Sequence, residues 1–507
     1  MKILSSQEIR TVDAKTIEYK AIHSYELMEM AASAFTDYFI NNYCIRDCNV
    51  GLFCGTGNNG GDGVAVAHFL YLAGYSVKIF IVEVSNNYST DCLLNIDRAE
   101  KAGLEIMKIT SVDQIPSLDN INVIIDAIFG TGLSRSLIGL AKEVIETINT
   151  LNKKVVSIDI PSGLFMDKST TVAINATETV TFQIPKLALF LPLNSQFVGH
   201  LSIVDIGLDE KAIVEAATDM YYLTDYTMAG FLKPLDKYTH KGIQGHALIV
   251  GGSLGKIGAV TLASKAALRS GCGLVTAFVP QCGVNVIQSA FPEAMVVQDE
   301  KDTHISSISY DINPSAIAIG MGMGQHKDTK EALHKFLKKS STPLVVDADA
   351  LNILFANPDW LQYLQPNTIL TPHPGELSRL IGEWEDDFDK IERTKHFARK
   401  YNLIVVIKGA HSLIIDSDYL YVNSSGTPAL ATAGSGDVLS GIIAGLLAQG
   451  YNPLIATKLG VYIHGMTANI TAQEINPRSF IATDIIDNIG KVYDSMNIVK
   501  NTDDLVL

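Results

Sequence analysis

The sequence contains little that would cross-link the chain or anchor it in a membrane. Only six of its 507 residues are cysteine, and none of them forms a C-x2-C pair, so reduced thiols are expected. The strongly apolar stretch over residues 442–448 is far shorter than the ~20 residues that a membrane span needs. The first ten residues hold no apolar signal segment. We therefore expect a cytoplasmic protein with no membrane partner.

Basic residues are in the minority. The chain has 39 Lys and Arg against 54 Asp and Glu, which gives a formal net charge of −15. No basic stripe is available to neutralise nucleic-acid phosphates, so nucleic acid is not an expected partner. Backbone N–H groups and single lysines can still bind small anions. An apolar fraction of 47% and a length of 507 residues indicate a well-packed protein of more than one domain.

Short β-branched runs alternate with helical segments along the whole chain, which is typical of an α/β fold with parallel sheets covered on both faces. We predict one domain over residues 1–225 and a second over residues 226–507, with residues 209–224 as a helix leading out of the first sheet. The predicted strands are residues 50–54, 77–84, 123–128, 155–160, 179–183 and 201–206 in the first domain, and residues 247–251, 274–279, 316–319, 344–347, 368–371, 403–408, 412–415 and 419–422 in the second.

A glycine-rich loop follows the first predicted strand. Gly55, Gly57 and Gly60 fit the G-x-G-x-x-G spacing between a strand and a predicted helix over residues 63–73. Glycines there let the backbone approach a pyrophosphate, which indicates a Rossmann-like, three-layer αβα domain. Glu83 ends the next strand, where a ribose-binding acid is expected. On this motif alone the domain could belong to a dehydrogenase.

Polar side chains suggest a more specialised site. Asn58, Asn59 and Asp62 lie inside the glycine loop, and Asp126 and Asp159 end two further strands. Ligands bind outside the carboxyl ends of the strands in such sheets, so these groups should converge. Their oxygens suit an alkali or alkaline-earth cation. The alternative is that the two aspartates only cap the helices that follow them.

The second half carries a phosphate-site pattern. Gly434, Ser435, Gly436 and Asp437 precede a predicted apolar helix over residues 438–448. Small residues at a helix start leave N–H groups that can form an anion hole for a transferring phosphoryl group. Asp437 could take a proton from a substrate hydroxyl as general base. The alternative is that Asp437 only stabilises the helix dipole.

Further polar residues of the second half also lie at strand ends. Lys408 suits a nucleotide phosphate, or it is a solvated surface lysine. His373 lies between two prolines in a stiff loop. Asp347 and Asp349 are paired acids that could orient Mg2+ or water. Their shared position at strand ends supports one site.

With these motifs, residues 1–225 resemble the NAD(P)H-hydrate epimerase domain. The resemblance rests on the loop at residues 58–63, on residues 129–132 and 159–163, and on Pro185-Lys186 and residues 204–207. It implies a catalytic role for Asp159 and a K+ ion held by Asn59, Asp126 and Ser162. The implied contacts with the hydrated nicotinamide nucleotide are Asn58, Asn59, Gly60, Gly61, Asp62, Gly130, Thr131, Gly132, Leu133, Ser134, Arg135, Ser136 and Asp159.

Residues 228–495 are similar to the ADP- or ATP-dependent NAD(P)H-hydrate dehydratase domain, which has a ribokinase-like fold. The similarity rests on residues 240–242, 245–246, 371–376, 408–412 and 434–437. It implies a catalytic role for Asp437, which also contacts the hydrate together with Ala259, Gly322 and His373. The implied ligands of ADP or ATP with Mg2+ are Lys408, Gly409, Ala410, His411, Ser412 and Gly436. Lys256 stands where this family often has an aromatic residue.

The combined resemblance implies a bifunctional repair enzyme, for which we also expect a homo-oligomer. Its first domain would interconvert the R and S hydrates of NADH and NADPH. Its second domain would dehydrate the S form at the expense of ADP or ATP, because a phosphorylated hydroxyl leaves more readily than hydroxide. Two alternatives stay open at this point. The second half could be a ribokinase-like small-molecule kinase fused to a nucleotide-binding domain, or the first half could be a non-catalytic nucleotide sensor.

Overall fold

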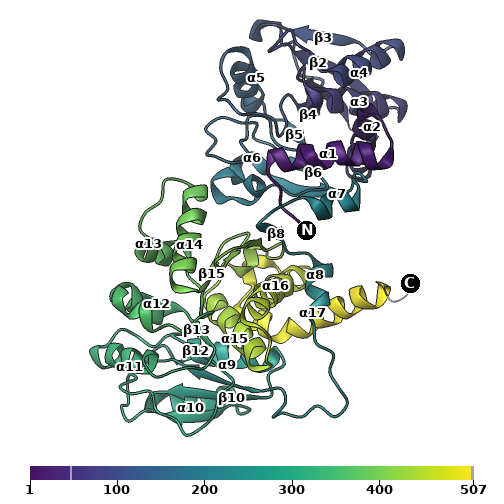
Figure 1. Cartoon of the computed structure of the whole chain (residues 1–507). Coiled ribbons are helices and arrows are strands. Elements are labelled where there is room, and N and C mark those ends of the chain that lie inside the picture. Colours follow the sequence, from purple (N-terminus) through teal and green to yellow (C-terminus); the bar gives the residue numbers. More distant parts are fainter. Residues whose placement is uncertain (46–47, 504–507) are drawn as a thin grey trace. The chain divides into compact units, whose positions relative to one another are not determined.

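The computed structural model describes residues 1–45 and 48–503 (Figure 1). They form two compact units, Met1–Thr218 with Asp386–Phe388, and Asp219–Glu385 with Asp389–Leu507. We describe each unit by itself.

The predicted helix over residues 209–224 is wrong. Helix α7 (Glu210–Glu215) is short, and strand β8 (Met220–Tyr222) follows it. β8 pairs in parallel with β17 (Leu420–Val422), and the ring of Tyr221 stacks on that of Tyr421 at 5.7 Å. Aromatic residues fit a pleated, half-buried edge strand, which explains the difference. The second unit therefore begins at Asp219, just before the predicted join at residue 225.

The first unit contains a seven-stranded, all-parallel sheet in the order β3-β2-β1-β4-β5-β6-β7. All predicted strands of this half are present, whereas the short, largely exposed edge strand β3 was not predicted. The strands are β1 (Asn49–Cys54), β2 (Ser76–Val82), β3 (Ile106–Ile109), β4 (Val123–Ala127), β5 (Lys154–Ile158), β6 (Glu178–Phe182) and β7 (His200–Val204). The helices are α1 (Ser6–Lys20), α2 (Ser24–Asn42), α3 (Asn58–Leu72), α4 (Thr90–Lys101), α5 (Gly139–Thr150), α6 (Ser195–Val198) and α7.

Strand β1 shows why this sheet is covered on both faces. Leu52 packs into a buried cluster with residues of α2, α3 and α4, whereas the next residue, Phe53, packs into a second cluster with α5. Successive strand side chains point to opposite faces, so an apolar run on one strand supplies two cores. The sheet order reverses direction between β1 and β4. A ligand site is expected at such a switch point, beyond the carboxyl ends of the strands.

The second unit contains a ten-stranded sheet in the order β11-β10-β9-β12-β13-β14-β15-β16-β17-β8. It is parallel from β11 to β15, and β16 is antiparallel to both of its neighbours. The other strands are β9 (His246–Val250), β10 (Leu274–Val279), β11 (Met295–Gln298), β12 (Ala316–Ile319), β13 (Leu344–Val346), β14 (Ile369–Leu370), β15 (Ile404–Ile407) and β16 (Leu413–Ile415). The helices are α8 (Asp225–Gly230), α9 (Ile257–Arg269), α10 (Val284–Ala290), α11 (Lys327–Leu337), α12 (Ala348–Phe355), α13 (Pro374–Ile381), α14 (Asp387–Tyr401), α15 (Ser435–Ala448), α16 (Pro453–Thr471) and α17 (Ala482–Asp503).

Helix α15 is buried along almost its whole length and packs against α9 and α16 (Figure 1). Two glycines allow the close approach to α9. A Cβ atom on Gly441 would lie 2.2 Å from the carbonyl oxygen of Ala263, and one on Gly445 would lie 2.1 Å from Oγ of Ser270. The apolar composition of α15 therefore reflects burial inside this unit. Within residues 1–45 and 48–503, no helix combines the length and apolar character needed to cross a membrane.

Candidate active sites

The glycine loop of the first unit forms the start of α3. Strand β1 ends at Cys54, and α3 begins at Asn58 with Gly57 as its N-cap. A Cβ atom on Gly55 would lie 2.1 Å from the carbonyl oxygen of Ile128, and one on Gly60 would lie 1.9 Å from that of Gly55. The loop thus requires glycine for backbone packing as well as for access to the helix N-terminus.

A cavity of about 700 Å³ opens at the carboxyl ends of β1, β4 and β5. It brings together most of the residues predicted to bind the hydrate, namely Asn58, Asn59, Asp62, Gly130, Thr131, Gly132, Leu133, Ser134, Arg135 and Asp159. Gly60 and Gly61 are buried in the first turn of α3, and Ser136 is exposed outside the lining. The lining also includes Asp13 of α1 and Lys186, for which sequence reasoning proposed no role.

Two acids of this cavity, Asp62 and Asp13, have raised pKa values. Burial and the negative charges of Asp159 and Asp13 raise the pKa of Asp62 well above its usual range. Burial and the charge of Asp159 raise the pKa of Asp13 to about 6, although Lys186 opposes this. Perturbed acids in a cavity are typical of sites that move protons.

Asp159 is held in a strained backbone conformation by a buried lysine. Its φ angle is +67°, in the left-handed region that non-glycine residues rarely adopt. The Nζ atom of Lys186, a residue that is 1% exposed, donates to Oδ1 of Asp159 at 2.5 Å and to Oγ1 of Thr181 at 2.8 Å. The backbone N–H of Phe182 donates to the same carboxylate oxygen at 3.0 Å. Among the described residues, the hydrogen bonds to this carboxylate all fall on Oδ1, at the cavity wall.

Asp126 and Asp159 do not cap helices, so that alternative is wrong. The next α-helix after Asp126 is α5, whose N-cap is Ile138. Asp126 is fully buried and accepts hydrogen bonds at 2.8 Å from Oγ of Ser157 and from the backbone N–H of Ser162. Burial raises the pKa of Asp126, and these hydrogen bonds oppose the shift.

Two of the three predicted K+ ligands are hydrogen-bonded to each other, because the backbone N–H of Ser162 donates to Asp126. Oγ of Ser162 contacts the backbone of Phe129, and a Cβ atom on Gly130 would lie 3.2 Å from Oδ1 of Asn59. Nδ2 of Asn59 is buried and has no hydrogen-bond partner among the described residues. A carboxylate, a hydroxyl and an amide oxygen are hard donors, so the set fits an alkali cation.

Glu83, the predicted ribose-binding acid, is engaged elsewhere. It accepts a hydrogen bond from the hydroxyl of Tyr88 at 2.8 Å and pairs with Lys108 at 3.4 Å. Both interactions lower its pKa. The cavity lining includes its neighbours Val84 and Ser85 but omits Glu83. The ribose-binding acid that a dehydrogenase would need is therefore missing from this cavity, and the dehydrogenase interpretation loses support.

In the second unit, α15 begins at the predicted phosphate-site pattern. Gly434 is the N-cap with a φ angle of +85°, and Ser435 is the first helical residue. Nε2 of His464, which lies on α16, is 3.1 Å from Oγ of Ser435 and 3.0 Å from its carbonyl oxygen. Burial lowers the pKa of His464 to about 4, so the ring is neutral and donates to that carbonyl. Sequence reasoning missed His464, although a histidine inside an apolar helix was a visible signal.

Charged groups gather at this helix start. Lys408 donates to Oδ1 of Asp347 at 3.0 Å, and Ser440 donates to Oδ2 of the same carboxylate at 2.7 Å. A Cβ atom on Gly436 would lie 3.5 Å from Nζ of Lys408. Burial and the charge of Asp347 raise the pKa of Asp437 to about 7, against the opposing charge of Lys408. A pKa near neutrality suits a general base.

A cavity of about 390 Å³ is lined in part by Asp437 and by Ala259 and Gly322, which were predicted to contact the hydrate. Gly322 has a φ angle of +62°, and a Cβ atom there would lie 2.6 Å from the carbonyl oxygen of Lys256. Asp349 also lines the cavity and pairs with Nζ of Lys256 at 3.4 Å. The lysine therefore brings a charge where an aromatic side chain would bring a flat apolar surface.

His373, also predicted to contact the hydrate, is the N-cap of α13 and is not among the residues that line this cavity. Its Nδ1 accepts hydrogen bonds from the backbone N–H groups of Gly375 and Glu376, and the Glu376 carboxylate accepts from the backbone N–H of His373. Glu376 itself lines the cavity. His373 and Glu376 thus cap the start of α13 reciprocally, between Pro372 and Pro374, and the cap places the Glu376 carboxylate at the cavity.

The predicted nucleotide loop joins β15 to β16. Gly409 and Ala410 are exposed, and Lys408 and Ser412 are half-buried. Nδ1 of His411 lies 3.2 Å from the carbonyl oxygen of Asn423, and burial lowers its pKa. The exposed residues Gly409 and Ala410 therefore follow Lys408 directly, so a nucleotide can reach their backbone.

Known proteins resemble both units. Residues 24–188 match a family described as YjeF-related protein N-terminus, and residues 247–491 match a family described as NAD(P)H-hydrate dehydratase. A bifunctional NAD(P)H-hydrate repair enzyme Nnr from Moorella thermoacetica is 34% identical over 507 residues, with 96% of each chain covered. The enzyme of the same name from Escherichia coli is 31% identical over 505 residues, covering 98% of this chain and 95% of the relative. A solved ADP/ATP-dependent NAD(P)H-hydrate dehydratase from Bacillus subtilis is 28% identical, with a TM-score of 0.49, and covers 55% of this chain and 100% of its own.

Proposed function

The chain belongs to the family of bifunctional NAD(P)H-hydrate repair enzymes, and on that premise we propose which of its residues perform each reaction. It is an NAD(P)H-hydrate epimerase and an ADP/ATP-dependent NAD(P)H-hydrate dehydratase. The observation that carries the residue assignment is the half-buried Asp437, with a pKa of about 7, in one cavity with Ala259 and Gly322.

We assign epimerisation to the cavity of the first unit. The hydrated ring has a carbon that bears a hydroxyl beside the ring nitrogen. Inverting the configuration of this carbon requires one of its bonds to a heteroatom to break and re-form. A proton must leave or join that heteroatom in each step. Asp159 is the proposed catalytic group for this proton transfer, because its carboxylate is fixed at the cavity wall by Lys186 and Phe182. Its rigid position supports proton transfer at one defined point on the ring.

The remaining residues of this cavity bind the nucleotide. The N-terminus of α3, with Asn58 and Asp62, and the segment at residues 130–135 line the space opposite Asp159. The helix start offers N–H groups and a positive dipole to the substrate phosphates. Asn59, Asp126 and Ser162 would hold K+, which would supply a fixed positive charge beside these phosphates.

We assign dehydration to the cavity of the second unit. Ala259 and Gly322 line this cavity and are proposed to contact the S hydrate, and these small residues leave room for its flat ring. His373, the N-cap of α13, is the third proposed contact. The adenine nucleotide enters along Lys408, Gly409, Ala410, His411 and Ser412, and its terminal phosphate lies at Gly436.

The proposed reaction has two steps. Asp437 accepts the proton of the substrate hydroxyl while the hydroxyl oxygen bonds to the terminal phosphorus, and the bond from that phosphorus to the nucleotide breaks. The phosphorylated oxygen then leaves as inorganic phosphate. Its C–O bond breaks, the adjacent carbon loses a proton, and the ring double bond returns. The products are the reduced nicotinamide nucleotide, phosphate and the shortened adenine nucleotide. The N–H groups at the start of α15 stabilise the charge of the transferring phosphoryl group.

The acids of this site fit a hard divalent cation that accompanies the nucleotide. Asp347 is buried, and Asp349 and Glu376 line the cavity. Mg2+ would neutralise phosphate charge there, and Asp347 and Asp349 are the proposed residues that hold it.

One assay tests this assignment. Purified S hydrate with ADP, or with ATP, should regain the absorbance of reduced nicotinamide, and Asp437→Ala should abolish this while epimerisation of the R form continues. A stable phosphorylated product without elimination would instead favour a small-molecule kinase. Loss of both activities in Asp437→Ala would contradict separate active sites. Light scattering of the purified chain tests the predicted homo-oligomer.

A further inference from the structure

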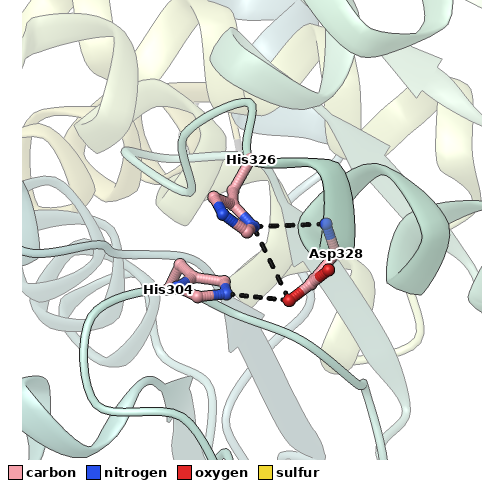
Figure 2. A group of neighbouring side chains, drawn as sticks. All are labelled: His304, His326 and Asp328. Atoms are coloured by element: carbon pink, nitrogen blue, oxygen red, sulfur yellow. Dashed lines mark hydrogen bonds and ion pairs between the residues drawn. The ribbon is translucent and has the colours of Figure 1, made fainter.

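Away from both cavities, three side chains of the second unit meet at the start of α11 (Figure 2). His326 is the N-cap of α11, and Asp328 lies in its first turn. His304 comes from the segment that follows β11 and faces the same point. One ligand atom of each residue lies within 4.8 Å of the other two. Two chain segments therefore present two imidazoles and a carboxylate to a common position.

The spacing of these atoms matches a metal centre. Nε2 of His304 is 3.2 Å from Oδ2 of Asp328, and Nδ1 of His326 is 3.7 Å from the same oxygen. Ligand atoms at about 2.1 Å from a tetrahedral zinc ion lie about 3.4 Å from one another. The two rings are 3.9 Å apart between centroids, so both nitrogens approach the carboxylate from one side.

The hydrogen bonds around the cluster show which ring nitrogens face the common position. Nδ1 of His326 accepts the backbone N–H of Asp328 at 3.2 Å, so this nitrogen carries a lone pair and no proton. Nε2 of His304 lies 3.2 Å from the Asp328 carboxylate, which only accepts, so this nitrogen carries the proton while no metal is bound. A bound metal displaces that proton, and Nδ1 of His304, 3.1 Å from Oγ1 of Thr303, then donates to that hydroxyl. Such outer hydrogen bonds fix the tautomer of metal-ligating histidines.

We propose that His304, His326 and Asp328 bind one Zn2+ ion. Nε2 of His304, Nδ1 of His326 and the Asp328 carboxylate are its protein ligands, and water takes the fourth position. Two imidazoles with one carboxylate suit zinc better than magnesium or calcium, which prefer oxygen ligands. The zinc ion replaces the weak bond between His326 and the backbone of Asp328. Helix capping accounts for His326, and the interaction with Asp328 accounts for the approach of His304. The metal accounts for the meeting of all three ligand atoms at one position.

The bound zinc ion fastens the segment around His304 to α11. The same segment also contacts the loop at residues 252–256 beside the dehydratase cavity. The carbonyl oxygen of Thr303 accepts a hydrogen bond from the backbone N–H of Leu254 at 2.9 Å. Lys256, two residues further along, lines that cavity. Zinc is thus a structural ion that restrains the loop at residues 252–256. This inference does not depend on the proposed roles of the catalytic residues.

Zinc titration of the chelator-treated full chain tests the proposal. Isothermal calorimetry and equilibrium dialysis should give one more zinc ion per chain for the unaltered protein than for His326→Asn, His304→Gln or Asp328→Asn. His326→Asn is the sharpest variant, because asparagine keeps the helix cap and removes the imidazole. His334→Asn, on the same helix but outside the cluster, should bind zinc like the unaltered chain. Equal zinc binding by His326→Asn and the unaltered chain would overturn the site.

Two further readouts separate a metal centre from loose surface binding. Co2+ in place of zinc should give the strong visible absorption of a tetrahedral complex, and this should be absent in His326→Asn. In the unaltered chain, zinc should slow hydrogen exchange at residues 252–256 and 303–305. This slowing should be at least ten times as large as the slowing that zinc causes in His326→Asn. Equal exchange in the two proteins would overturn the fastening role.

Discussion

Nζ of Lys186 lies 2.5 Å from Oδ1 of Asp159, and the lysine side chain is almost wholly buried. The lining of the same cavity includes three more acids, Asp13, Asp62 and Asp91. The pKa values of Asp13 and Asp62 are raised, in part by the charge of Asp159. Without the lysine, Asp159 would share the cavity with these acids and have no buried positive charge beside it. Lys186 therefore determines where negative charge can reside in the epimerase site.

The first prediction concerns Lys186→Met. We expect it to reduce epimerisation at least 100-fold and to destabilise the first unit by about 3 kcal/mol, because one partner of a buried ion pair is left uncompensated. Epimerisation is followed by the conversion of purified R hydrate into S hydrate. Lys142→Met, which removes a half-exposed surface lysine, is the matched control and should be neutral. An epimerisation rate within twofold of the unaltered protein would show that Lys186 has no role there.

The second prediction concerns the pH dependence of dehydration. A general base must be ionised, and the pKa of Asp437 is about 7. We expect the rate on the S hydrate at low substrate concentration to fall about tenfold for each pH unit below that value, whereas epimerisation should not follow this profile. Asp437→Asn should abolish dehydration at every pH. A dehydration rate that is flat between pH 5.5 and 8 would exclude Asp437 as the base.

The same group gives a third prediction, on stability. Its folded pKa of about 7 lies above the unfolded value of 3.8, so the folded state binds more protons between these values. Stability is therefore lost as the pH rises through this window. Asp437→Asn should be more stable than the unaltered chain at pH 8, by at most about 4 kcal/mol, and the gain should shrink towards pH 4. Both tryptophans, Trp360 and Trp384, belong to the second unit, so fluorescence during urea unfolding reports on it. A pH-independent gain would contradict the shifted pKa.

The strand-end residues could be predicted because their position follows from local sequence. Asn59, Asp126 and Asp437 each follow a β-branched run or open an apolar helix, and parallel strands bring such ends together. Asp13 could not be found in this way. It lies in helix α1 and has the sequence context of a surface acid, and it becomes half-buried because it lines the cavity. Tertiary packing of this kind leaves no local pattern.

The short strands were missed for a related reason. β3 and β11 are exposed edge strands of four residues each, and β8 has three residues. Such segments hold too few buried side chains to show alternation. Their neighbours in the sheet, rather than their own composition, make them strands.

The fourth prediction is that epimerisation depends on K+. Replacing K+ by tetramethylammonium should lower the epimerisation rate at least tenfold, and Asp126→Asn should be slow in either salt, because the cluster then lacks its carboxylate. Dehydration of purified S hydrate in the same samples is the internal control and should change less than twofold. An epimerisation rate that is equal in the two salts would remove K+ from the first unit.

The last prediction concerns Gly322→Ala. The φ angle of Gly322 is +62°, and an added Cβ atom would lie 2.6 Å from the carbonyl oxygen of Lys256 and 3.1 Å from Cβ of Ala259. The methyl group would therefore strain the backbone and narrow the dehydratase cavity. We expect the KM for S hydrate to rise at least tenfold and the second unit to lose about 1–2 kcal/mol, the usual cost of a left-handed alanine.

Gly382→Ala separates these two effects. Its φ angle is +82°, but no described atom lies within 4 Å of the added Cβ atom. Its ψ angle is 174°, in a region that only glycine adopts readily, so the alanine should also strain the backbone. The strain should be seen in tryptophan fluorescence during urea unfolding, and the KM for S hydrate should stay unchanged. If both variants raise KM alike, backbone strain, and not the filled cavity, weakens substrate binding. If Gly322→Ala binds S hydrate normally, the hydrate does not lie against Gly322, and the proposed position of its ring in the second unit is wrong.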